Sequence, residues 1–175
     1  IYSQYFDIQI RPSEKIFTTF GARRDSHTTA GDFTTYRFTS AYKPNSSTKF
    51  RNSIGTGIRF ATLNDYFYDT NVIRKENLKP EKSYSIDFGI EKKLLQDRLV
   101  IDSTVFHMEY DDTISGWQSH TASGGGFTIE NSSGVVKSTG FEFSASLITE
   151  LIDKINFGYS FVDAYDGEDC DNPDS

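Results

Sequence analysis

The feature that most constrains this chain is an alternation of apolar and polar residues with a period of two. It is cleanest over residues 84–91, YSIDFGIE, where every second residue is a Tyr, Ile or Phe. Successive side chains of a β-strand point to opposite faces of a sheet, so the pattern predicts a strand with one apolar and one polar face. The chain is therefore expected to be all-β, with a sheet that separates two different environments.

The same alternation predicts about eight strands of about ten residues, the length that spans a bilayer when a strand is tilted. They cover residues 1–11, 16–25, 33–42, 48–59, 84–90, 99–110, 127–147 and 155–164. In residues 99–110 apolar side chains occur at both odd and even positions, so the facing of this strand is left open. The segment 116–126 is rich in Gly and Ser and is expected to be a loop.

The expected connections alternate between short and long. Short ones fall at residues 12–15, 44–47, 94–98 and 149–154, and long ones at 26–32, 60–82, 116–126 and after 163. Outer-membrane barrels have short turns at one end and long loops at the other, whereas a soluble sandwich has no reason to segregate them. The pattern favours an antiparallel up-and-down transmembrane β-barrel segment.

Composition limits the alternatives. Aromatic residues make up 15% of the chain, with 15 Phe and 10 Tyr, which suits a sheet with two unlike faces and equally suits a soluble antiparallel β protein. The net charge is −7, and six acidic residues lie within residues 163–175, so the rest of the chain is close to neutral. No basic stripe is present, and we therefore expect no nucleic-acid partner.

Several segments resemble, in order, the barrel of TonB-dependent outer-membrane receptors. They are GTGIR (55–59), FATLNDYFY (60–68), NLKPEKS (77–83), YDDTISGW (110–117), TIENSS (128–133) and STGFEFSASL (138–147). Matches to the family pattern are Arg59, Leu63, Tyr66, Asn77, Leu78, Pro80, Glu81, Lys82 and Ser83. Ala61-Thr62 departs from it, because the family has Ala-Pro there.

The resemblance implies a protein of the bacterial outer membrane, with a barrel of about 22 strands that encloses a plug. Residues 1–175 would then be a partial barrel domain, with the plug and the remaining strands outside it. The implied function is TonB-energised uptake of a scarce ligand: an iron–siderophore complex, haem or vitamin B12. The implied partners are outer-membrane lipid, the protein's own plug, TonB, and a small-molecule or metal-chelate ligand.

Two groups of residues are candidates for function. The polar faces of the expected strands would present to the lumen Arg51, Arg59, Asp87, Glu91 and Glu142. The long loops carry aromatic residues that could bind an external ligand, because aromatic side chains give large contact areas: Tyr66, Phe67, Tyr68, Trp117 and His120. Mutual ion pairing in a wet interior would explain the first group equally, and loop packing the second.

Other chemistry finds little support. The three His residues lack metal-ligand spacing, and no cofactor motif or nucleophile with a paired base is found, so we expect neither a metal site nor an enzyme. The acidic segment 166–174 could bind Ca²⁺ but does not match an EF-hand loop. Cys170 is the only cysteine, either a free thiol or paired outside these residues.

Two alternatives remain open at this point. One is a complete, small eight-stranded outer-membrane barrel with a structural or adhesive role, whose own side chains fill its interior. The other is a soluble β-sandwich binding module, in which two packed sheets bury apolar inner faces.

Overall fold

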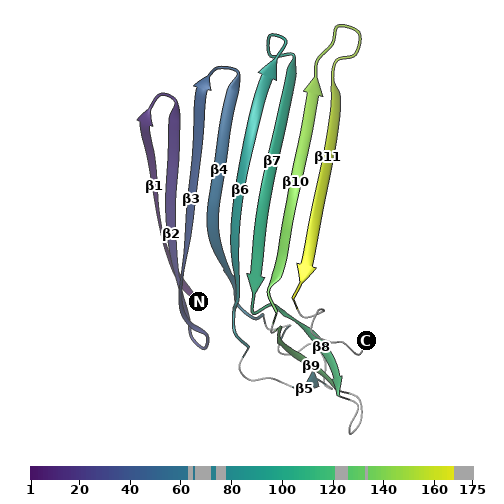
Figure 1. Cartoon of the computed structure of the whole chain (residues 1–175). Coiled ribbons are helices and arrows are strands. Elements are labelled where there is room, and N and C mark those ends of the chain that lie inside the picture. Colours follow the sequence, from purple (N-terminus) through teal and green to yellow (C-terminus); the bar gives the residue numbers. More distant parts are fainter. Residues whose placement is uncertain (63–64, 66–71, 74–77, 121–125, 133, 168–175) are drawn as a thin grey trace.

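The computed structural model describes residues 1–62, 65, 72–73, 78–120, 126–132 and 134–167. Eight long strands form one sheet (Figure 1). They are β1 (Tyr2–Ser13), β2 (Ile16–His27), β3 (Gly31–Asn45), β4 (Thr48–Arg59), β6 (Glu81–Leu94), β7 (Leu99–Asp111), β10 (Val136–Leu147) and β11 (Ile155–Asp166). A second, three-stranded sheet contains β5 (Val72–Ile73), β9 (Gly126–Asn131) and β8 (Ile114–His120).

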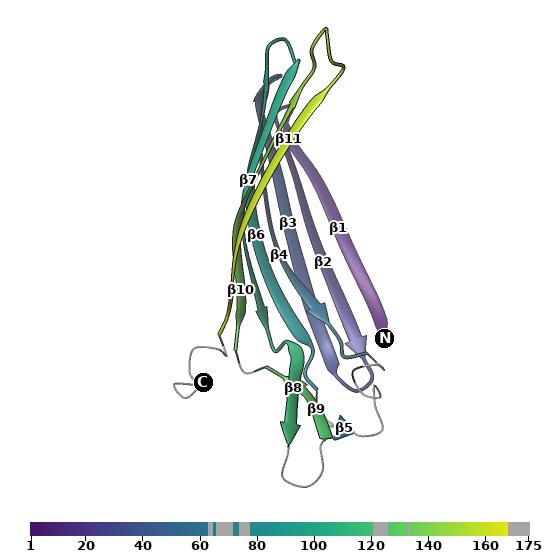
Figure 2. The same ribbon diagram turned by 90° about the vertical axis from the view of Figure 1, so that its right-hand side faces the viewer.

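The large sheet has the order β1-β2-β3-β4-β6-β7-β10-β11, and every neighbouring pair is antiparallel. The expected up-and-down sheet is thus confirmed. The sheet is twisted and curved, and β1 and β11 lie at its two opposite edges (Figure 2). These eight strands therefore do not close on themselves, in contrast to a complete eight-stranded barrel.

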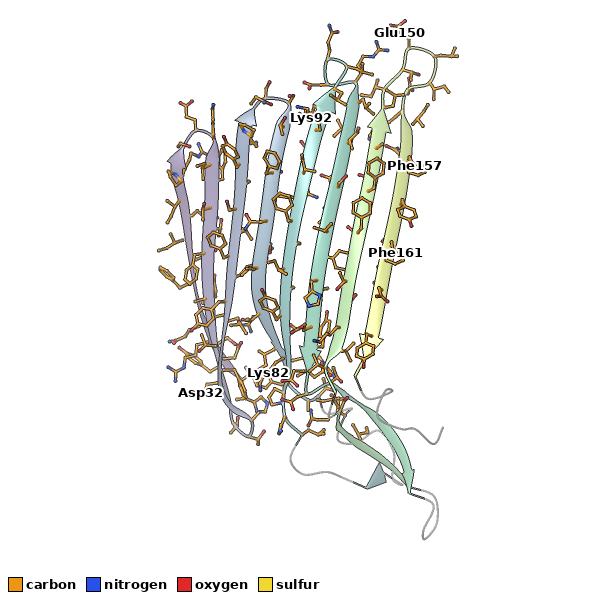
Figure 3. The ribbon with its side chains drawn as sticks, in the orientation of Figure 1. Asp32, Lys82, Lys92, Glu150, Phe157 and Phe161 are labelled. Carbon is orange, nitrogen blue, oxygen red and sulfur yellow. The ribbon has the colours of Figure 1, made fainter. Side chains whose placement is uncertain are left out.

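The two faces of the sheet differ in character. Cross-strand register places on one face Phe20, Phe38, Ile54, Ile86, Phe88, Val105, Phe141 and Phe161. Along this apolar face the large side chains stay exposed or half-exposed, with Phe88 at 50%, Phe157 at 58% and Phe161 at 56% (Figure 3). Within the described residues the only buried hydrophobic side chain is Leu78. A sandwich with a dry core between two sheets is incompatible with this burial pattern.

Register also fixes the facing of β7, which the sequence left open. Val105 pairs with Phe88 on one side and Phe141 on the other, so the odd-numbered residues of β7 belong to the apolar face. Phe106 and Met108 consequently lie on the polar face, while His107 and Glu109 lie on the apolar one.

Two expected connections differ from the structure. The long loop expected at residues 26–32 is a tight turn, because β2 continues to His27 and β3 begins at Gly31. The turn is closed locally: His27 Nδ1 accepts hydrogen bonds from the Thr29 and Ala30 amides at 3.2 and 3.1 Å, and Gly31 has a φ of 89°. A β-branched residue would be strained at that φ, and glycine is not.

The single strand expected over residues 127–147 is in fact two strands. β9 ends at Asn131 and pairs with β8 in the small sheet, whereas β10 begins at Val136 and joins the large one. Part of the expected Gly/Ser-rich loop is strand β8. The small sheet lies beyond the end of the large sheet that is opposite the turns joining β1 to β2, β3 to β4, β6 to β7 and β10 to β11 (Figure 1).

Candidate functional site

The polar face of the large sheet holds the predicted strand residues together. Arg51 pairs in register with Gly89, Asp87 with Ser53, Glu91 with Lys49, and Arg59 with Glu81. Glu142 pairs with Thr104, which in turn pairs with Gly89, so it shares this face. All five predicted residues therefore point to one side of the sheet, spread over three strands.

Arg51 makes a contact on this face by reaching across a neighbouring strand. Its guanidinium group donates to the Asp102 carboxylate at 2.5 and 2.6 Å and to Thr104 Oγ1 at 2.6 Å. Asp102 and Thr104 lie on β7, and β6 runs between β7 and the strand that carries Arg51. The crossing is possible because position 89 is glycine: a Cβ there would lie 2.8 Å from the guanidinium carbon.

A second side chain lies flat on the polar face, over the strand directly beside its own. The Phe106 ring covers Gly140 on the adjacent strand β10, where an added Cβ would overlap the ring and come within 2.7 Å of the Phe161 carbonyl oxygen. The glycine creates the hollow that the ring fills. This explains why an apolar residue occupies the polar face, and why residues 99–110 lack a simple alternation.

The remaining predicted acidic residues of this face are not paired. Among the described residues, Asp87, Glu91 and Glu142 take part in none of the direct ion pairs of the structure. Beside them, a hollow of about 390 Å³ opens on the same face, lined by Asp102, Glu142 and neighbouring residues of β10 and β11. The polar face therefore carries carboxylates without a direct ion pair near the Arg51–Asp102 pair, and Asp87 and Glu91 act on Arg51 over a longer distance.

A second polar cluster lies where the two long connections leave the sheet. Arg59, the last residue of β4, forms a bidentate pair with Glu81, the first residue of β6, with both N–O distances at 2.5 Å. Glu81 Oε1 also accepts a hydrogen bond from the Ile114 amide at 2.7 Å, at the start of β8. The Arg59 guanidinium further approaches Asp65 at 3.5 Å.

Asn131 completes this cluster from the other long connection. Its amide group donates to the carbonyl oxygens of Lys79 at 2.8 Å and Asp112 at 2.6 Å, and its side-chain oxygen accepts from the Lys79 amide at 2.8 Å. The Ser132 amide then donates to the Thr113 carbonyl at 2.7 Å. Asn131 was not among the predicted site residues, although it lies within the TIENSS segment.

The aromatic loop residues are placed only in part. Tyr66, Phe67 and Tyr68 lie outside the described residues. The backbones of Trp117 and His120 belong to β8, paired with Ile129 and Gly126, and their side chains are outside the described part. Their role in ligand binding therefore stays a prediction.

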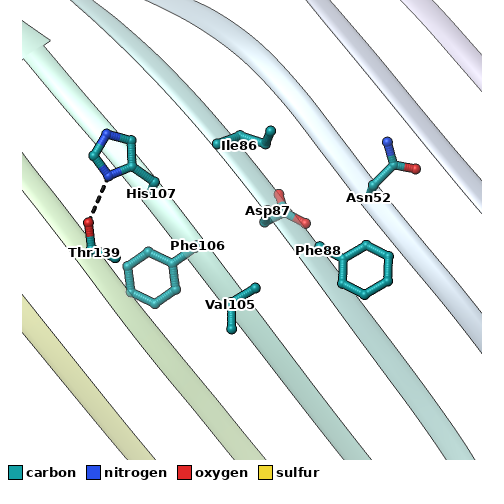
Figure 4. Close-up of a pocket in the computed structure, with 8 residues that line it drawn as sticks. All are labelled: Asn52, Ile86, Asp87, Phe88, Val105, Phe106, His107 and Thr139. Carbon is teal, nitrogen blue, oxygen red and sulfur yellow. Dashed lines mark hydrogen bonds between the residues drawn. The ribbon is translucent and has the colours of Figure 1, made fainter.

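The apolar face has a hollow of its own, of about 620 Å³, lined mainly by Ile86, Phe88, Val105, His107 and Thr139 (Figure 4). The His107 ring pairs with Thr139 Oγ1 at 2.7 Å and with Glu109 at 3.2 Å. These polar groups satisfy one another, so they can lie beside an apolar surface at little cost.

Two further features concern possible metal sites and membrane-spanning helices. The described residues contain no group of three His, Cys, Asp or Glu side chains placed to hold a metal ion. Nor does any helix in this part of the chain have the length and apolar character needed to cross a membrane.

Comparison with known proteins identifies relatives of the whole segment. The family model described as "TonB dependent receptor-like, beta-barrel" matches residues 1–175. Among solved structures, this chain is similar to the siderophore receptor PirA from Pseudomonas aeruginosa, with a TM-score of 0.80 and 16% sequence identity. The alignment covers 94% of this chain and 34% of the PirA chain. No curated protein sequence matches.

Two further structures show the same likeness. The copper transporter OprC matches 95% of this chain and 30% of its own, with a TM-score of 0.75 at 16% identity. For the siderophore receptor PiuA from Acinetobacter baumannii, the alignment covers 93% of this chain and 25% of the PiuA chain, with a TM-score of 0.65 at 22% identity. At these identities the likeness shows the fold alone. The chain spans about a third or less of the length of the receptors it matches.

Proposed function

This chain belongs to the TonB-dependent receptor-like β-barrel family, and from that membership we propose that it is the membrane-spanning part of a receptor for energised uptake across the bacterial outer membrane. Its apolar face contacts lipid, and its polar face lines the lumen of a larger barrel. The two long connections, with the small sheet, lie on the external side. Their aromatic residues contribute to ligand binding, and a plug and the remaining strands complete the protein.

The observation that carries this proposal is an apolar band with charged limits. On β6 the apolar-face residues from Tyr84 to Ile90 are bracketed on the same face by Lys82 and Lys92 (Figure 3). Ten residue steps at about 3.3 Å span about 33 Å. A strand tilt of about 40° reduces this to about 25 Å, the height of the apolar band of outer-membrane barrels.

The limit of the band also shifts across the sheet as tilted strands require. On β6 the external limit is Lys82, whereas on β11 the corresponding charged residue is Asp163. Through Thr139 and His107, Asp163 is in register with Ile86, four residues further along β6 than Lys82. In a barrel the strands are tilted, so a plane perpendicular to the barrel axis crosses successive strands at shifted positions. The shift between Lys82 and Asp163 therefore supports strands that cross the membrane at a tilt.

The ligand class follows from the relatives as a proposal. Siderophore receptors and a copper transporter share the fold, so we infer a metal chelate as ligand, ahead of haem and vitamin B12. The carboxylates on the polar face are compatible with a metal-chelate ligand, because the plug would also line the path that the ligand takes through the lumen.

Uptake measurements test the proposal. The whole protein would be expressed in a Gram-negative strain that lacks its own receptors. Accumulation of labelled iron(III) citrate, an iron(III) tris(catecholate), an iron(III) tris(hydroxamate), haem, cobalamin and Cu²⁺ would then be compared. We expect saturable uptake of at least one metal chelate that stops when TonB is removed. Uptake that does not depend on TonB, or uptake of none of the six, would contradict the proposal.

A further inference from the structure

The two long connections are separated along the chain by the whole β6–β7 hairpin, yet their bases are in contact. One connection runs from the end of β4 to Glu81, and the other from the end of β7 to Val136. Backbone pairing within the large sheet does not link them to each other. The small sheet does link them, through the pairing of β5 with β9, and Lys79 and Lys82 form ion pairs with Asp112. At the bases themselves, hydrogen bonds join the connections through two side chains, Asn131 and Glu81, which belong to different connections.

Asn131 links both sides because a carboxamide is donor and acceptor at once. Toward the first connection it makes two hydrogen bonds with the backbone of Lys79, one in each direction, both at 2.8 Å. Toward the second it donates a hydrogen bond, at 2.6 Å, to the carbonyl oxygen of Asp112, whose own φ is 55°. An aspartate at this position would keep the accepted bond and lose both donated ones.

Glu81 provides the reverse link. One carboxylate joins the ends of β4 and β6 through Arg59 and reaches the Ile114 amide of the second connection. The Glu81 side chain is only 16% exposed, and that of the nearby Asp112 is 17% exposed. Charge-assisted hydrogen bonds that are partly shielded from water are stronger than exposed ones, so this link resists local opening.

We propose that Asn131 and Glu81 are positioning residues that lock the bases of the two long connections into one body. The β8–β9 hairpin then keeps a fixed place relative to the segment that enters β6. This inference rests on the proposed function for its purpose, because a ligand that touches both connections would meet a surface of fixed spacing. The lock itself can be tested without any ligand.

Hydrogen exchange of the whole protein in detergent micelles provides that test. In Asn131→Asp, we expect the amides of β8 and β9 and the amide of Lys79 to exchange together, about tenfold faster, because local opening then breaks two fewer hydrogen bonds. The amides of β2 and β3 should keep their wild-type rates. Glu81→Gln should accelerate the same β8 amides from the other side of the cluster, through loss of the charged pair with Arg59.

A matched control is Asp32→Asn, which removes an ion pair with Arg24 at 2.7 Å at the same end of the sheet but between β2 and β3. It should leave β8 and β9 unchanged. Faster exchange confined to the residues flanking position 131, or wild-type exchange in both variants, would overturn the lock. Failure of uptake with coupled exchange intact would overturn the transport proposal instead and leave the lock standing.

Discussion

The two faces of the large sheet solve different packing problems. On the apolar face, large side chains of neighbouring strands stand side by side, as the diagonal neighbours Phe50 and Phe88 do with ring centroids 6.3 Å apart. On the polar face, side chains lie flat across neighbouring strands, and glycines such as Gly89 and Gly140 leave the space they need. The difference shows that glycine here serves side-chain crossing rather than turn formation, since these positions lie in the middle of strands.

The largest effect should come from a charge on the apolar face. Phe88→Lys places an ammonium group near the middle of the band and should lower the free energy of unfolding in lipid by ~2–4 kcal/mol. Asp87→Lys, one residue away on the polar face, is the matched control and should change it little. Urea titration of the whole protein in lipid vesicles measures both. Equal losses in the two variants would refute the assignment of the faces.

A methyl group on the polar face should have a smaller effect that depends on its position. Gly140→Ala forces the Phe106 ring and the Phe161 backbone apart and should cost about 1–3 kcal/mol. Gly21→Ala, where the nearest atom to the new Cβ is 3.6 Å away, is the control and should stay within about 0.5 kcal/mol. Combining Gly140→Ala with Phe106→Ala should be less costly than the sum of the two, and strict additivity would rule out the crossing contact.

The smallest effect should come from blocking the Arg51 crossing. Gly89→Ala brings a Cβ within 2.8 Å of the guanidinium group, which is flexible enough to move away and give up its contacts with Asp102. We expect a loss of about 1 kcal/mol, the size of one or two hydrogen bonds. In an Arg51→Met background the same change should be nearly neutral. A double-mutant cycle by urea unfolding measures this coupling, and a cycle without coupling would show that Gly89 has another role.

Much of this architecture could be predicted from the sequence. When one face of a sheet is apolar and the other polar, the alternation of apolar and polar residues shows which side chains of a strand point to which face. β7 escaped prediction for a physical reason: Phe106 faces the polar side to fill the space above Gly140, a contact that depends on which residue β10 brings alongside. His107 and Glu109 could lie on the apolar face because Thr139 and Lys137 on the same neighbour satisfy them. Both pairings are non-local, so local periodicity does not contain them.

At the base of the long connections, the sequence predicted Arg59 as a site residue and marked Glu81 as a family match, but it did not predict that the two form an ion pair. The NLKPEKS segment marked Glu81, and the end of the GTGIR segment marked Arg59, yet their pairing across the ends of β4 and β6 required the register. Asn131 was missed because residues 127–147 were predicted as one strand, although the polar run over residues 130–134 interrupts the alternation. The chain leaves one sheet for the other after position 131. The hydrogen bonds that Asn131 makes to Lys79 and Asp112 fix that point of departure.

The strand order has a consequence for how the sheet forms. The turns within β1–β4, β6–β7 and β10–β11 are short, whereas β4 and β6 are separated by residues 60–80, and β7 and β10 by residues 112–135. Closing a loop of about 20 residues costs roughly 2 kcal/mol more entropy than closing one of two. We therefore expect the sheet to form as three blocks, β1–β4, β6–β7 and β10–β11, whose strands pair locally first. The blocks then join in two slower steps. Insertions in the long connections should delay those joining steps and leave the formation of each block unchanged.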